Sequence, residues 1–194
     1  MGFGGLRMKR EYELVLHPQM ASLHVFLVRI DYRAPHAHME MEVGVVLEGE
    51  LLLSTNRGST ALRAGDMYYL NSMDFHELQA RGSTALILAI QISEGMIAPY
   101  YPVIRNLVVQ DVAVRPYFAG ATARYQDCLV RAAQLTLDYL DCAPHYEFLC
   151  TALLNQLLFE LYARLPYATL SEPEIAVLAS RNTRINRVLD YIDQ

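Results

Sequence analysis

The sequence is short of positive charge and of cysteine, and it has no long apolar run. Its 194 residues include 16 Lys and Arg against 21 Asp and Glu, which gives a formal net charge of −5. A DNA-binding domain usually carries a basic face, because the neutralisation of phosphates dominates its affinity. We therefore expect this chain on its own to bind DNA poorly.

Segments that target a protein to a membrane or export it are also lacking. The longest apolar stretch, around residues 85–90, is far too short to cross a membrane. The glycine-rich, basic start has no apolar core of a signal peptide behind it. The three cysteines, Cys128, Cys142 and Cys150, have no metal-site spacing and suit buried, reduced thiols. These absences predict a cytoplasmic protein without membrane contact.

The first part of the chain has the pattern of a β-barrel or sandwich. Hydrophobic residues make up 53% of the chain, which is enough for one sizeable core. Between residues 12 and 114, short apolar runs are separated by turn signals, for example at residues 56–59 and 64–66. Residues 84–92 are expected to form a central strand. Residues 1–11 form an expected N-terminal arm, either folded over the mouth of the barrel or disordered.

After residue 114 the apolar positions recur every 3.6 residues, which indicates helices. One helix is expected at residues 122–141, and a second from Pro144 to about Leu165, before Pro166. The second carries an apolar stripe that must pack on the first helix, on the barrel or on a second copy of the chain. We expect residues 115–170 to be a dimerisation segment. The expected dimer contacts are Leu153, Leu154, Leu157, Leu158 and Leu161.

The most specific local pattern is a group of histidines with a glutamate. The spacing is His36-x-His38-x-x-x-Glu42, followed by Gly49, and His76 comes later. On one extended strand the first three side chains would share a face, because they lie an even number of residues apart. A hairpin return of the chain would then bring His76 alongside them.

Three imidazoles and one carboxylate can ligate a divalent transition metal. This donor set suits zinc, nickel, iron or manganese better than calcium or magnesium, which prefer oxygen ligands. Glu40 is the rival carboxylate, because it has the same parity as Glu42. The same side chains can also line a site that holds no metal, so the sequence is compatible with both a metal site and a metal-free site.

The histidine pattern resembles the first sequence motif of the cupin fold, which it matches completely. The second cupin motif is matched in part: Gly65 and His76 are in place, but Asn71 and Met73 stand where that motif has proline and glycine. The resemblance covers residues 12–114. It implies a mostly β fold with added α-structure: a cupin-like jelly-roll barrel followed by a helical segment.

The order of the parts resembles the AraC family of transcription regulators. The resemblance is carried by residues 36–42, 46–50 and 62–66, and by residues 184–192, which look like the first helix of that family's DNA-binding domain. It implies a barrel that binds a small metabolite, such as a sugar, helices that form a homodimer, and two helix-turn-helix units that bind a promoter. Residues 171–194 would then be a linker and a truncated DNA-binding domain, so DNA contact belongs to the parent protein.

Residues of the effector pocket should point into the barrel and offer polar groups among apolar walls. The candidates are His36, His38, Glu42, His76, Arg29, Tyr68, Tyr69 and Gln91. For the last four, a place on the surface is an equal alternative.

The leading hypothesis is a ligand-sensing and dimerising part of a regulator, without enzymatic activity. The alternative is a metal-dependent cupin enzyme, such as an isomerase or dioxygenase, because open positions on a histidine-rich site suit both roles. The helical C-terminal part favours the regulator, since an enzyme barrel has no need of it. A third hypothesis is a dimerisation module with an empty barrel.

Overall fold

The computed structural model describes residues 20–174 and the backbone of residues 12–14. The expected N-terminal arm and the expected helix at residues 184–192 lie outside the described residues, and both stay predictions. Within the described part, antiparallel strands come first and helices follow.

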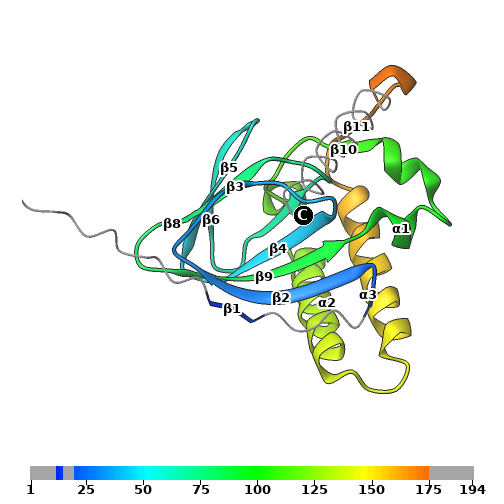
Figure 1. Cartoon of the computed structure of the whole chain (residues 1–194), viewed down its shortest axis with the longest axis horizontal. Coiled ribbons are helices and arrows are strands. Elements are labelled where there is room, and N and C mark those ends of the chain that lie inside the picture. Colours follow the sequence, from blue (N-terminus) through cyan, green and yellow to red (C-terminus); the bar gives the residue numbers. More distant parts are fainter. Residues whose placement is uncertain (1–11, 15–19, 175–194) are drawn as a thin grey trace, which may run out of the picture.

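The strands form two sheets that face each other as the walls of a barrel (Figure 1). In chain order they are β1 (Tyr12–Leu14), β2 (Leu23–Ile30), β3 (Tyr32–His36), β4 (Met41–Glu48), β5 (Glu50–Thr55), β6 (Gly58–Arg63), β7 (Met67–Leu70), β8 (His76–Ala80) and β9 (Ala85–Ile92). One sheet has the order β1-β2-β9-β4-β7 and the other β3-β8-β5-β6. The middle place of β9 in the five-stranded sheet confirms the expected central strand.

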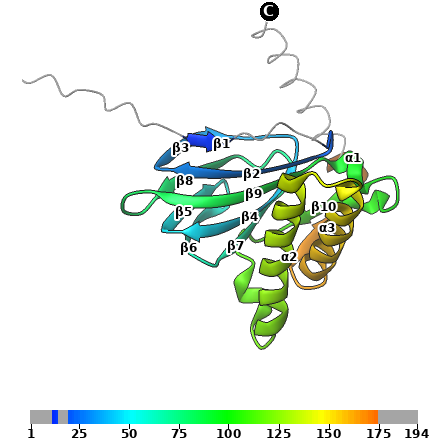
Figure 2. The same cartoon turned by 90° about the horizontal axis from the view of Figure 1, so that it is seen from below.

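Helical elements follow the barrel and lie on one side of it (Figures 1 and 2). They and two short strands are α1 (Glu94–Ile97), η1 (Pro102–Asn106), β10 (Leu107–Val109), η2 (Arg115–Phe118), α2 (Thr122–Asp141), α3 (Tyr146–Tyr162) and β11 (Tyr167–Thr169). A barrel followed by helices is the predicted fold class. None of the helices in the described ranges has the length and apolarity to cross a bilayer.

The two long helices differ in how well periodicity predicted their ends. α2 spans the predicted residues 122–141. α3 begins at Tyr146 rather than at Pro144, because His145 has a φ of 70°, which a right-handed helix cannot include. α3 ends at Tyr162, a little before the expected Leu165, and β11 follows Pro166 directly.

The cysteines match their expected environment only in part. All three are free thiols, and Cys128 and Cys150 are buried between the helices and the sheet. Cys142 is exposed, contrary to the expectation, because it caps the end of α2 in a left-handed conformation with a φ of 48°.

The five-stranded sheet is covered on both faces, and this determines the pattern of apolar residues along its strands. In β4, Glu42 and Val46 face the barrel interior, whereas Met41 and Val43 pack against the helices. Successive residues of a strand point to opposite faces, so a strand covered on both sides needs apolar residues at consecutive positions. This explains why β4 and β9 read as apolar runs and not as alternating patterns.

The leucine stripe of α3 packs within its own chain, and this corrects its expected role at a dimer contact. Leu154, Leu157, Leu158 and Leu161 are buried in the core that α2, α3 and the five-stranded sheet share. Leu153 is partly buried against the same core. Of the three partners expected for this stripe, it packs against two, α2 and the barrel.

Candidate metal and effector site in the barrel

The four residues of the histidine motif meet inside the barrel. His36 is the last residue of β3 and pairs across the ladder with His76, the first residue of β8. The ring centroids of these two lie 4.1 Å apart, and the ring of His38 lies 5.2 Å from that of His76. Glu42 comes from β4, in the opposite sheet. Both walls of the barrel therefore contribute to one site.

The route by which these residues converge differs from the expected one. No single strand carries His36, His38 and Glu42: β3 ends at His36, and the chain crosses to the other sheet before β4 begins at Met41. The side chains meet because both sheets face the same interior, and not because of parity along one strand. His76 arrives through the pairing of β8 with β3, and not through a hairpin return at residue 65.

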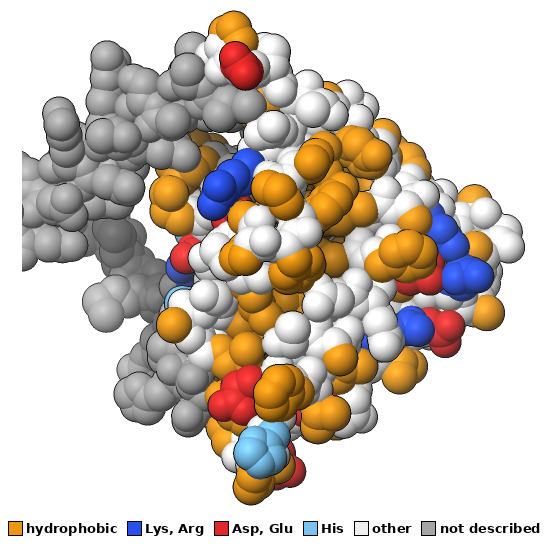
Figure 3. Space-filling view, turned by 90° about the vertical axis from the view of Figure 1, so that its right-hand side faces the viewer, with side chains coloured by type: hydrophobic (Ala, Val, Ile, Leu, Met, Phe, Trp, Pro, Cys, Tyr) orange, Lys and Arg blue, Asp and Glu red, His pale blue; other side chains and the backbone are white. Residues whose placement is uncertain are grey.

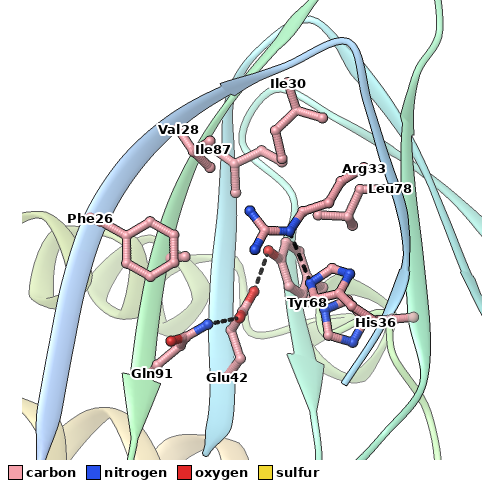
Figure 4. Close-up of a pocket in the computed structure, with 12 residues that line it drawn as sticks. Phe26, Val28, Ile30, Arg33, His36, Glu42, Tyr68, Leu78, Ile87 and Gln91 are labelled. Atoms are coloured by element: carbon pink, nitrogen blue, oxygen red, sulfur yellow. Dashed lines mark hydrogen bonds between the residues drawn. The ribbon is translucent and has the colours of Figure 1, made fainter. Parts of the chain in front are cut away.

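The carboxylate of Glu42 is the centre of the hydrogen-bond network (Figure 4). The Tyr68 hydroxyl donates to its Oε1 at 2.7 Å, and the Gln91 amide donates to its Oε2 at 2.9 Å. The Nε2 atom of His38 lies 3.0 Å from the same Oε2. Three side chains thus hold one buried carboxylate in a fixed orientation.

A glycine on β4 makes room for one of these donors. A Cβ atom on Gly44 would lie 1.9 Å from Cζ of Tyr68, so only glycine leaves space for the ring at this position. The Tyr68 ring lies over this gap and carries its hydroxyl to Glu42. The strand sequence Glu-x-Gly therefore contributes both the acceptor and the space for its donor.

Burial and neighbouring charges shift the pKa values of the site in different directions. Burial alone would raise the pKa of Glu42, but the hydrogen bond and charge of His38 and the bonds from Gln91 and Tyr68 lower it to about 2. Burial alone would lower the pKa of His38, but the bond and charge of Glu42 outweigh it and raise that pKa. Burial lowers the pKa of His76. The site therefore offers an ionised carboxylate at neutral pH.

Three of the residues form a group that could hold a metal ion: His38, Glu42 and His76. One ligand atom from each lies within 4.8 Å of the others. The Nδ1 atoms of His38 and His76 lie 2.9 and 2.8 Å from the backbone carbonyl oxygens of Glu40 and Asp74, which fixes the hydrogen on Nδ1. Each ring then turns Nε2 towards the site, as metal-ligating histidines usually do. Nε2 of His76 offers a lone pair, whereas Nε2 of His38 donates to Glu42 and would have to release its hydrogen to bind a metal. A bound metal would act there as a Lewis acid.

His36 departs from the expected set of four ligands. Its Nδ1 bonds to the carbonyl oxygen of Ala34 at 2.9 Å, and its Nε2 accepts a hydrogen bond from Nε of Arg33 at 3.1 Å. Burial lowers its pKa to about 4, so the ring is neutral. With both ring nitrogens engaged, His36 lies beside the three-residue group and outside it.

The rival carboxylate lies at the edge of the site. The carboxylate of Glu40 lies 3.8 Å from Nδ1 of His38, and its side chain is less buried than that of Glu42. Glu42, and not Glu40, is therefore the carboxylate that faces the histidines.

The four weaker candidates for the effector pocket divide into two pairs. Tyr68 and Gln91 line the cavity of the barrel. Tyr69 faces the helices, where its hydroxyl lies 2.7 Å from that of Tyr162, and Arg29 is on the outer surface, paired with Glu48 at 2.9 Å. Arg29 therefore takes the surface place that was its equal alternative, whereas Tyr69 corrects the expectation, because it is buried on the opposite face of the sheet.

Sequence reasoning missed one cavity residue, Arg33. It is separated from His36 by an odd number of positions, so a regular strand would turn the two side chains to opposite faces. The pairing of β3 with β8 shifts register between these two residues, and this irregularity lets both point inwards. Pro35 between them was the one signal in the sequence, since proline in a sheet tends to mark bulges.

The cavity itself is small, and apolar and polar side chains contribute equally to its walls. Its free space is about 20 Å³. The remaining lining residues are Phe26, Val28, Ile30, Leu78, Ile87 and Ala89.

The two departures from the second cupin motif have structural reasons. Asn71 exchanges two hydrogen bonds with the backbone of Val109, and its own N–H donates to Asp74, which proline could not do. Met73 has a φ of 62°, a conformation that favours the glycine of the motif. Its N–H donates to the carbonyl oxygen of His38 at 2.8 Å, so this loop supports the site.

Comparisons with known proteins point to the same part of the chain. Residues 29–91 match the cupin domain family. No curated protein matches the chain. Among solved structures, a cupin-2 domain-containing protein from Shewanella frigidimarina is 25% identical over 42% of this chain and 79% of its own, with a TM-score of 0.37.

Two further solved structures are similar over less than half of the chain. A mutant oxalate decarboxylase from Bacillus subtilis is 22% identical over 43% of this chain, with a TM-score of 0.38, and the match spans only 25% of its own length. The cupin domain of Cnp3 from Schizosaccharomyces pombe is 7% identical over 47% of this chain and 70% of its own, with a TM-score of 0.43. The family match over residues 29–91, together with the two facing antiparallel sheets, identifies the barrel described above as a cupin domain.

Proposed function

We propose that this chain is the ligand-sensing and dimerising part of a transcription regulator similar to those of the AraC family. The cupin site is the sensor, and its ligand is a small metabolite. A divalent transition metal held by His38, Glu42 and His76 would be part of that sensor. DNA contact is assigned to helix-turn-helix units of the parent protein, because the net charge of −5 does not suit phosphate binding.

The observation that carries this proposal is a direct path from the site to the helices. Glu42 and Tyr68 bond to each other inside the barrel, and their chain neighbours Met41 and Tyr69 face the other way. The Tyr69 hydroxyl lies 3.2 Å from the Met41 sulfur and 2.7 Å from the Tyr162 hydroxyl on α3. A ligand that moves β4 or β7 would therefore shift α3.

The proposal also includes a homodimer, now assigned to the outer face of the helices. Phe148 and Phe159 of α3 are 76% and 68% exposed, and they lie three turns apart on one side of the helix. Val130 and Leu137 of α2 are exposed as well. Figure 3 looks onto the side of the molecule that carries α1 and α3, where hydrophobic side chains gather. A two-fold pairing is the commonest way to cover such a surface.

Light scattering on the purified chain tests the dimer. We expect twice the chain mass of 22.0 kDa. The double variant Phe148→Glu and Phe159→Glu should be monomeric, with the melting temperature that the wild type has when it is diluted to the monomer, because neither side chain belongs to the core. Leu47→Glu, an exposed position on the barrel, is the matched control and should remain dimeric. A wild-type monomer at all accessible concentrations would refute this part.

A gel-shift series tests the regulatory role. The 194-residue chain should not bind promoter DNA specifically, whereas the full-length parent protein should, with an affinity that changes when the barrel ligand is added. Variants Glu42→Gln and His76→Ala of the parent protein should lose this response and keep basal DNA binding. Specific nanomolar binding by the short chain would contradict the proposal.

The metal-capable group also favours a second candidate, a metal-dependent cupin enzyme such as an isomerase or dioxygenase. Three donors within 4.8 Å leave open coordination positions, and a catalytic metal needs these. Turnover of a bound ligand by protein loaded with iron, manganese, nickel or zinc, absent in His76→Ala, would replace the regulator by the enzyme.

A further inference from the structure

Arg33 is the one cation in the barrel cavity, among the residues that the structure describes, and neither the motif nor the metal group uses it. Its side chain enters the cavity from β3 and is half-buried. Figure 4 shows the Nε atom of Arg33 directed towards the His36 ring, with the two terminal nitrogens directed away from it, towards the middle of the cavity. Its Nε donates to His36, and this is its only hydrogen bond to a described residue.

Arg33 lacks a counter-charge within the described part of the chain. Other arginines, such as Arg57 and Arg124, have a carboxylate partner at 2.7–2.8 Å. The one carboxylate that lines the cavity, that of Glu42, is already held by three side chains and makes no ion pair with Arg33. A guanidinium that is taken out of water without an anion costs free energy, so an unpaired one in a cavity favours an anionic ligand.

The free hydrogen-bond donors of Arg33 suit a particular anion. The two terminal nitrogens carry four N–H groups in one plane. This fork matches the two oxygens of a carboxylate, which can accept two parallel hydrogen bonds from it. A hydroxyl group of a neutral sugar would use only one arm of the fork and would leave the charge unpaired.

The free space limits the size of the ligand. A volume of about 20 Å³ corresponds to room for one or two water molecules. A carboxylate group fits such a space, whereas a sugar ring would need the walls to move apart. Phe26 and Ile87 on the opposite side offer an apolar surface to a short carbon chain.

We infer that the ligand of this barrel is a small carboxylate, whose carboxylate group enters the cavity and is held by Arg33 through a paired hydrogen bond. The inference rests on the proposed function in taking the cupin site as the ligand site, and it replaces the sugar by an anion. Arg33 thus determines specificity for charge, while the three-residue group lies beside the bound carboxylate.

Calorimetric titration of the full 194-residue chain with acetate, oxalate, malonate and succinate tests the inference. Acetamide and malonamide serve as neutral counterparts of similar shape, and glucose serves as an uncharged ring. At least one carboxylate should bind, and its amide should bind at least about tenfold more weakly, because charged hydrogen bonds contribute more than neutral ones. Arg33→Gln should weaken carboxylate binding about 10–100-fold.

Two variants sharpen this result. Arg33→Lys keeps the charge and loses the fork, so its affinity should lie between those of the wild type and Arg33→Gln. Arg29→Gln removes an arginine that lies on the outside, paired with Glu48, and should bind like the wild type. Equal melting temperatures and equal metal contents in all variants would show that only ligand binding has changed.

Several outcomes would overturn the inference: no carboxylate binds at millimolar concentration, the amides or glucose bind as tightly as the carboxylates, or Arg33→Gln leaves the affinity unchanged. Failure of the regulator proposal has a separate readout. Arg33-dependent carboxylate binding without any effect on promoter binding by the parent protein would refute the regulator and keep this inference. A promoter response to a neutral ligand alone would refute this inference and keep the regulator proposal.

Discussion

The two faces of the five-stranded sheet are built from alternate residues of the same strands, yet they differ in what they hold. The inner face carries Glu42, Tyr68 and Gln91, joined by hydrogen bonds around one carboxylate. The outer face carries apolar side chains such as Val43 and Ile90, which pack against the helices. Polar groups in an interior must be paired, while apolar contacts need only volume and shape. Changes on the outer face should therefore cost stability, and changes on the inner face should mainly alter the site.

The largest effect is expected on the outer face. Leu157 of α3 is fully buried against this core. Leu157→Ala should lower the free energy of unfolding by about 2–5 kcal/mol, because it leaves a cavity in a packed core. Phe159→Ala, two positions along and exposed, is the matched control and should change the stability of the monomer little. Urea unfolding at a concentration below that of dimerisation measures both, and an equal loss in the two variants would contradict this account of the outer face.

A methyl group on the inner face should affect stability and the site together. In Gly44→Ala the new Cβ would overlap the ring of Tyr68, at 1.9 Å from Cζ. We expect a loss of about 1–3 kcal/mol from overpacking. Because the displaced ring takes its hydroxyl away from Glu42, metal affinity should fall as well.

Gly95→Ala is the control for this variant, since its Cβ would meet only Ser93 Oγ, at an ordinary 3.6 Å. Thermal unfolding and elemental analysis of the two proteins give the comparison. A Gly44→Ala protein with wild-type stability and metal content would show that Tyr68 does not need this space.

The part of the structure that could be predicted from the sequence differs between the two faces of the sheet. Turn signals and a change of period predicted the barrel and α2, because these patterns depend on local chemistry alone. The meeting of His38, Glu42 and His76 was predicted as well, but for a different reason from the one that the sheets provide. The leucine stripe of α3 could not be assigned from sequence, since a stripe looks the same whether its partner is the same chain or a second copy.

The direction of single side chains was the least predictable feature. Tyr68 and Tyr69 are identical neighbours, and parity says that they point apart but not which of them points inwards. That choice is made by Gly44, which leaves space for one ring and lies far away in sequence. Arg33 was missed because a shift of register in β3 overrides parity.

These two tyrosines give the most direct comparison of the faces. Tyr68→Phe and Tyr69→Phe each remove one buried hydroxyl that makes a hydrogen bond, so each should cost about 1 kcal/mol of stability. Only Tyr68→Phe should also weaken metal binding, by about 10–100-fold, because its hydroxyl orients the ligand Glu42. Zinc titration against a competing chelator, together with urea unfolding, separates the two effects. Equal metal affinity in both variants would mean that the inner network does not orient Glu42.

The smallest effect is expected at Met73, in the loop that bonds to the backbone of His38. Its φ of 62° is unfavourable for a residue with a side chain, by about 1–2 kcal/mol. Glycine removes this strain but loses more freedom on folding and gives up the partly buried side chain, so Met73→Gly should raise stability by less than about 1 kcal/mol. Met73→Val should instead lower it, because a β-branched residue tolerates positive φ worst. Thermal unfolding of the two variants should place them on opposite sides of the wild type. If valine is the more stable of the two, the loop does not hold this conformation in solution, and its support of His38 would have to come from elsewhere.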